Sequence, residues 1–284
     1  LALLVFMRQI HLWPAACLWT AAWLGSARDE DPASPYLADE WHALTREPKP
    51  RFARAGLAIA ATLPAFAVVA AFASLWGGLT PPMFQGEVVG EVGHQGLNPA
   101  AAPFVLSIFA IVSVFYLGFL GAPIGWMLAR GKRWALVAAI AGAAVALLPA
   151  TTFDQDAGRW TGLWNIAGAL PSMGGRTSLL ILLLSAAGGV FVLLWALAVP
   201  RRDRWVLLAA LVAFMAAMTA SQELWQRYVE PAVLMLVILL AVRTAPVDPR
   251  SPMHLARLGG PLLLGVAFAA LTAYKIATSP VHPG

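Results

Sequence analysis

The chain has 284 residues, of which 60% are hydrophobic and only 12% are charged. A soluble domain carries about 25% charged residues, so this composition excludes an ordinary water-facing exterior. The net charge of +5 comes from short clusters between apolar blocks. That distribution is typical of membrane topology and argues against a nucleic-acid partner.

Apolar runs that are long enough to cross a bilayer recur along the chain. A spanning helix needs about 20 mostly apolar residues, and lipid requires its backbone to be hydrogen-bonded internally. The sequence therefore predicts an all-α, polytopic transmembrane helical bundle of about eight spanning helices in a single domain, 1–284. The expected spans are 1–25, 55–79, 102–128, 134–151, 178–199, 205–220, 224–242 and 260–278. The run AAIAGAAVALL within the fourth span favours close packing between helices.

Basic residues divide the connecting segments into two alternating sets. One set, which includes a mixed-charge connector over 26–53, holds fourteen of the nineteen Lys and Arg residues. The positive-inside rule places this set in the cytoplasm, so that both chain ends and the loops 80–101 and 152–177 are extracytoplasmic. The compact loops and the composition rich in Ala, Arg and Trp favour a bacterial inner membrane, and an ER membrane is the alternative.

The chain begins inside an apolar run, without Met and without the basic segment of a signal peptide, so we expect further helices before Leu1. Cys17 is the single cysteine, which excludes an internal disulfide. No CxxC or HExxH spacing occurs. The sequence predicts no cofactor, although it leaves the involvement of a divalent metal open.

The first candidate site is the pair Arg8 and Gln9 in the first expected span. Ionisable groups at membrane depth are costly and usually functional, so Arg8 is a candidate to hold a lipid phosphate or to pair with a carboxylate. The alternative is an Arg side chain that reaches up to the outer interface.

The second candidate lies in the loop 152–177, where Asp154, Arg159 and Trp160 occur close together, with Trp164 following. Carboxylates beside Trp rings suit sugar recognition, because hydroxyl groups need acceptors and a ring face can stack on the sugar. The alternative is an interfacial aromatic belt with a structural Asp–Arg pair.

The third candidate is the segment SQELWQRYVEP, which leads into the seventh expected span. Here Arg227 and Tyr228 would lie at the interface, and Arg can hold phosphate oxygens in a bidentate fork. The alternative is an interfacial anchor, for which Trp225 and Tyr228 are ordinary residues. His94 and Asn98 are weaker candidates, since such residues in a loop rich in Gly and Pro are more often structural hydrogen-bond partners.

Four segments in this order resemble a known family. They are RQIHLW in the first span, WGGLTPP followed by His94 and Asn98, DQDAGRWTGLW in the outer loop, and WQRYVEP before the seventh span. Together they resemble the C-terminal half of GT-C membrane glycosyltransferases. The likeness extends to dolichyl-phosphate-glucose α-1,2-glucosyltransferases and their bacterial relatives.

The resemblance implies an enzyme that moves a sugar from a polyprenyl-phosphate carrier to a glycan or lipid acceptor on the extracytoplasmic side. In GT-C enzymes the catalytic carboxylate lies in the first outer loop, so the resemblance places it upstream of Leu1. The residues it implies in binding the carrier phosphate or the sugar are Arg8, Gln9, Asp154, Arg159, Trp160, Arg227 and Tyr228.

Two other classes of membrane protein remain open. A transporter or flippase for a lipid-linked or small polar substrate would favour charges inside the membrane and broken helices in repeated halves. Most charges here lie in loops, and no internal repeat is evident. A non-catalytic membrane scaffold would need no polar clusters on the outer face.

Overall fold

The computed structural model describes residues 1–2, 9–25, 48–78, 97–160, 162–221, 224–244 and 252–278. Within these ranges the fold is all-α, as predicted. The α-helices are α2 (Pro14–Leu24), α4 (Pro48–Trp76), α5 (Ala101–Val114), α6 (Gly121–Ala129), α7 (Lys132–Leu147), α8 (Leu163–Ala169), α9 (Leu179–Ala198), α10 (Arg201–Thr219), α11 (Gln226–Val242) and α12 (Pro252–Thr278). The other described elements are two short 3-10 helices, η1 (Gln9–Leu12) and η3 (Leu117–Phe119), and the antiparallel strand pair β1 (Ser172–Met173) and β2 (Thr177–Ser178).

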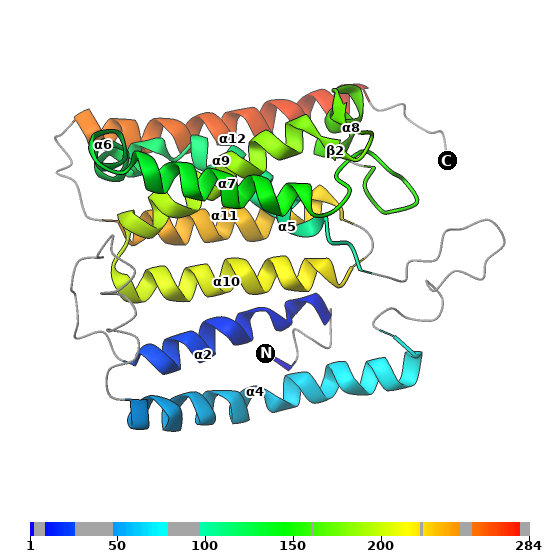
Figure 1. Cartoon of the computed structure of the whole chain (residues 1–284), viewed down its shortest axis with the longest axis vertical. Coiled ribbons are helices and arrows are strands. Elements are labelled where there is room, and N and C mark those ends of the chain that lie inside the picture. Colours follow the sequence, from blue (N-terminus) through cyan, green and yellow to red (C-terminus); the bar gives the residue numbers. More distant parts are fainter. Residues whose placement is uncertain are drawn as a thin grey trace.

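The long helices lie side by side with alternating directions, so their connections gather at two opposite ends of the bundle (Figure 1). We call one the aromatic end; it consists of residues 97–100, 151–160, 162–178, 220–221 and 224–226, on the right of Figure 1. The other is the arginine end, which consists of residues 129–133, 199–204 and 243–244, on the left. This separation is what the alternating charge of the loops predicted.

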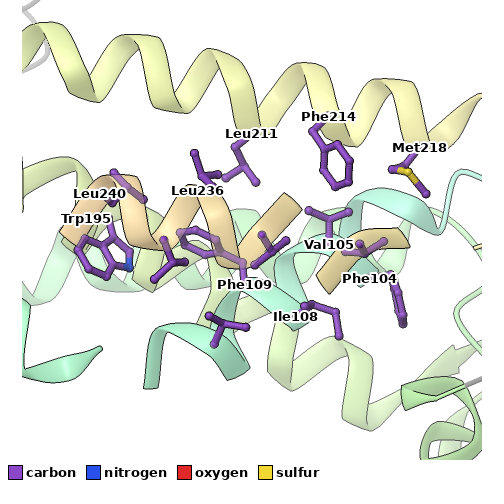
Figure 2. Packing of buried hydrophobic residues seen from close by; sticks show 14 of the residues in the cluster. Phe104, Val105, Ile108, Phe109, Trp195, Leu211, Phe214, Met218, Leu236 and Leu240 are labelled. Carbon is purple, nitrogen blue, oxygen red and sulfur yellow. The ribbon is translucent and has the colours of Figure 1, made fainter. Parts of the chain in front are cut away.

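Helix α5 forms the centre of the bundle. It is apolar on all sides and is packed against α7, α9, α10 and α11, which is the surrounding that such a helix requires. Figure 2 shows Val105 and Phe109 of α5 facing Leu211 and Phe214 of α10 and Leu236 of α11. The core therefore lies between the two ends and holds their loops in fixed positions.

Helices α7 and α9 approach each other through glycines. A Cβ added at Gly142 would overlap the carbonyl oxygen of Ser185, and one added at Gly189 would overlap that of Ala138. The Ser185 hydroxyl donates a hydrogen bond to the Gly142 carbonyl oxygen at 2.7 Å. Small residues let membrane helices pack this closely, so the prediction from AAIAGAAVALL is confirmed.

Within the described ranges, three helices are long and apolar enough to cross a membrane: Lys49–Trp76, Leu179–Ala198 and Arg257–Tyr274. Large apolar side chains on these and neighbouring helices are exposed, such as Leu63 of α4, Ile140 of α7 and Leu262 of α12. These features support a membrane protein. The eight crossings remain a prediction, because several expected spans are shorter helices and α10 begins with the charged run RRDR.

The expected span 102–128 is not one helix. Helix α5 ends at Val114, and η3 follows. The axis of α6 is turned away from the direction of the long helices, so α6 is seen end-on in Figure 1. Three residues of types that interrupt helices locally lie at this break: Gly118, Gly121 and Pro123. Helix α12 packs on the break, where a Cβ at Gly260 would overlap the carbonyl oxygen of Phe115.

Three other expected boundaries differ from the structure. Residues 48–53, expected in the connector 26–53, form the first turns of α4, because Pro is well tolerated at the start of a helix. Residues 26–47 lie outside the described ranges, as does most of the loop 80–101. The loop 152–177 contains α8 and the strand pair, and the expected span 1–25 contains η1 followed by α2.

Candidate functional site

Asn98 joins three segments at the aromatic end. Its backbone N–H donates to the carbonyl oxygen of Thr219 at 2.8 Å, and its side-chain amide donates to that of Ala157 at 3.0 Å. Its Oδ1 accepts a bond from the backbone N–H of Ala100, which starts the turn into α5. Asn98 is buried, so these bonds are shielded from water. The end of α10, the start of α5 and the outer loop are thereby held together, which agrees with the structural interpretation of Asn98.

The segment from Asp154 to Arg159 folds into a tight turn. The two residues form an antiparallel bridge, with backbone bonds of 2.9 and 2.8 Å in the two directions. Asp154 Oδ1 also accepts the backbone N–H of Ala157 at 3.0 Å. Gly158 has a φ of +69°, a conformation that glycine adopts without strain, and its carbonyl oxygen accepts the N–H of Leu224. The turn therefore sits directly beside the segment that leads into α11.

The Arg159 guanidinium is committed to this turn. Its Nη2 lies 3.1 Å from Asp154 Oδ2, and its Nε donates to the Thr152 carbonyl oxygen at 2.9 Å. The Arg159 side chain is only 8% exposed, against 42% for that of Asp154. Burial lowers the pKa of Arg159, and the opposing charge of Asp154 counteracts that shift. Of the pair, only Asp154 presents a polar group to the surroundings.

Helix α8 is fastened to the start of α11 by Gln226. The side-chain Oε1 of Gln226 accepts the backbone N–H of Leu163 at 2.6 Å, and its amide donates to Glu230. Gly162 has a φ of +59°, and a Cβ at this position would overlap Gln226 Oε1. Only glycine therefore suits this close approach of the two segments.

Trp164 belongs to the core. Its ring stacks on Phe104 with centroids 4.7 Å apart, and its indole N–H donates to the Leu224 carbonyl oxygen at 3.3 Å. Its side chain is fully buried, so it cannot stack on a ligand in this arrangement.

Three further residues, Trp160, Trp225 and Tyr228, form an aromatic cluster. The rings of Trp160 and Trp225 meet edge to face at 5.2 Å, and Tyr228 lies 6.2 Å from Trp225. The guanidinium carbon of Arg227 lies 3.8 Å from the centroid of Trp225 and 5.1 Å from that of Tyr228. Such cation–π contacts favour the charge at these positions. An Nη of Arg227 also donates to the Tyr228 hydroxyl at 3.3 Å.

Among the described residues, two exposed cations lie at this end: Arg176 donates to the Leu148 carbonyl oxygen at 2.6 Å, and Arg227 lies against the aromatic cluster, so we take Arg227 as the candidate for a ligand. It is exposed, and its contacts with the rings leave room for further acceptors on the guanidinium. The cluster places apolar ring faces next to a permanent positive charge. Chemically, this combination suits a ligand that carries both an anionic oxygen group and an apolar portion.

The structure thus brings together two groups of the predicted residues. Asp154 pairs with Arg159, while Trp160, Arg227 and Tyr228 meet around Trp225. Arg8 and His94 lie outside the described residues, and so does the side chain of Gln9. Sequence reasoning missed that Gln226 joins α8 to the start of α11. The available signal was its position, because it is a polar residue directly before an apolar helical run.

The described part of the chain contains no group of three or more His, Cys, Asp and Glu residues arranged to hold a metal ion. Comparisons with protein-family models, with curated proteins and with solved structures find no match for this chain.

Proposed function

We propose that this chain is part of a membrane glycosyltransferase and that it binds a polyprenyl-phosphate-linked sugar for transfer to an extracytoplasmic glycan or lipid acceptor. The observation that supports the proposal is Arg227, an exposed cation held over the aromatic cluster. Arg binds phosphate oxygens bidentately, and a cation on these oxygens makes phosphate a better leaving group.

The neighbouring groups suit the sugar itself. The partly exposed ring of Trp160 offers an apolar surface, and the partly exposed carboxylate of Asp154 offers acceptors for hydroxyl groups. Arg159 would act indirectly, by holding Asp154 in place through their ion pair. The proposal assigns no catalytic base to this chain.

The membrane arrangement is part of the same proposal. The arginine end faces the cytoplasm by the positive-inside rule, and the aromatic end faces outwards in a bacterial inner membrane. Eight crossings then place both ends of the chain outside. A lipid-linked donor has its phosphate at the membrane interface, which is where Trp and Tyr side chains gather.

The test is sugar transfer in proteoliposomes that contain the product of the gene encoding this chain, supplied with radiolabelled polyprenyl-phosphate sugars. Arg227→Ala should lower kcat/KM about 100-fold or more, as removal of one charge-stabilising donor does in other enzymes. Arg227→Lys should recover part of the activity, because Lys keeps the charge without the bidentate fork.

The matched control is Arg133→Ala, which removes an exposed cation from the arginine end. Its turnover should equal that of the unaltered protein. Unaltered turnover in Arg227→Ala, with folded protein present, would reject the phosphate-binding role. The absence of transfer from every donor would favour transport or a scaffold instead.

A further inference from the structure

An apolar cavity lies between α2, α10 and α11. Its volume is about 140 Å³. Leu211 and Phe214 of α10 and Leu236 of α11, labelled in Figure 2, form its inner wall. Trp13, just before α2, and Cys17 of α2 form the opposite side, and Trp13 meets Phe214 edge to face at 5.8 Å. Such a lining gives water no hydrogen-bond partners, so the cavity favours an apolar occupant.

The cavity opens sideways from the bundle. Met235 and Leu239 of α11 line it and are 47% and 46% exposed. In a bundle that spans the membrane, this side faces hydrocarbon, since lipid surrounds the helices at that depth. The molecules with direct access to the mouth are therefore lipid chains.

One face of α11 connects this mouth to the aromatic end. Tyr228, Ala232, Met235 and Leu239 are spaced by four, three and four residues, which places them on the same side of a helix. With a rise of 1.5 Å per residue, the face extends over about 16 Å from Tyr228 to Leu239. One leaflet of a bilayer with a hydrocarbon core of about 30 Å has nearly the same depth.

Arg227 stands at the outer limit of this face. Its guanidinium lies over the Tyr228 ring and donates to the Tyr228 hydroxyl. A cation is thus fixed at the interface, directly above a continuous apolar face that leads to a cavity. Only a molecule with an anionic headgroup and a hydrocarbon chain matches both features at once.

We infer that Arg227 and the cavity between α2, α10 and α11 form one binding site for a polyprenyl phosphate, with the phosphate at Arg227 and one isoprene unit of the chain in the cavity. The identity of the lipid rests on the proposed function, whereas the site rests on the geometry. The size agrees: a dry engineered cavity of about 150 Å³ holds benzene, which is close in size to a five-carbon isoprene unit.

The test is binding to the purified full protein in detergent, measured by native mass spectrometry with undecaprenyl phosphate, dioleoyl phosphatidic acid or dioleoyl phosphatidylcholine. Ala232→Phe places a ring in the cavity, where it takes the space of the isoprene unit. Retention of undecaprenyl phosphate should therefore weaken at least about tenfold, because ring and lipid chain together would overpack the cavity. Arg227→Ala should weaken it by a similar factor, since it removes a charged hydrogen-bond donor.

Two controls match these changes. Ala269→Phe adds the same ring on the exposed side of α12, and Arg133→Ala removes an exposed cation from the arginine end. Both should bind like the unaltered protein. If Ala232→Phe does not fold, Met235→Trp at the exposed mouth serves as the second blocking variant.

Cys17 provides an internal reporter, because it is the single cysteine and lines the cavity. Bound undecaprenyl phosphate should slow its alkylation by N-ethylmaleimide several-fold, whereas phosphatidylcholine should not. Unchanged alkylation, or full retention in a folded blocking variant, would overturn the site. Equally tight retention of phosphatidic acid would overturn the assignment of the lipid. In another outcome, Ala232→Phe loses binding while the unaltered protein transfers no sugar from any donor. That pair of results would support the lipid site and contradict the proposed function.

Discussion

The two ends of the bundle use their charged and polar residues in different ways. At the aromatic end, Asn98 and Gln226 bond to backbone groups of distant segments, and Arg159 is buried against Asp154. At the arginine end, the turns are short and Arg133 is exposed, whereas Arg204 at the start of α10 is buried. The difference is that side chains of the aromatic end bond to backbone groups of distant segments, whereas the arginine end combines exposed cations with the buried Arg204.

The largest effect on stability should come from Arg159→Ala. The variant removes a buried cation, its bond to the Thr152 carbonyl oxygen and the partner of Asp154. Each hydrogen bond to a charged group contributes about 1.5–3 kcal/mol, so the loss of these two bonds should cost about 3 kcal/mol, since the Asp154 that remains is partly exposed. Thermal unfolding in detergent would measure the loss. Arg133→Ala should change the free energy of unfolding by less than about 0.5 kcal/mol. Equal losses in the two variants would contradict the difference between the two ends.

Asn98→Ala should follow, with a loss of about 2 kcal/mol, because it leaves the partly buried carbonyl oxygen of Ala157 and the buried N–H of Ala100 without the Asn98 partner. Increased proteolysis of the outer loop should accompany the loss. The matched control is Asn165→Ala on the exposed side of α8, which should be nearly neutral. Wild-type stability in Asn98→Ala would show that the three segments are held together by other contacts.

The apolar runs were sufficient to predict most of the helices, because hydrophobic length depends on local sequence. The break after Val114 was not predicted, because hydropathy continues through it and because the packing of α12 on it at Gly260 joins segments that are far apart in the sequence. The site was predicted in part for the same reason. Arg227 and Tyr228 are sequence neighbours, but Asn98 and Ala157 are 59 residues apart, and only the fold brings them into contact.

The smallest effect should come from the arginine end, at the ion pair between Asp203 and Arg243. Their side chains lie 2.7 Å apart, but Arg243 is 54% exposed. Asp203→Asn should therefore lower stability by only about 0.5 kcal/mol, and high salt should reduce even that difference. A double-mutant cycle with Arg243→Gln would isolate the pair energy. A coupling energy above about 2 kcal/mol between Asp203 and Arg243 would show that polar side chains stabilise the arginine end as well.

The central claim is that the two ends lie on opposite sides of a membrane, with the aromatic end outside. The most direct measurement is labelling of intact cells with a membrane-impermeant maleimide, in a Cys17→Ser background that carries either Gln155→Cys or Arg133→Cys. Both positions are exposed, one at each end. We predict that Gln155→Cys is labelled in intact cells and that Arg133→Cys is labelled only after the membrane is opened. Labelling of Arg133→Cys in intact cells, with Gln155→Cys protected, would contradict the account.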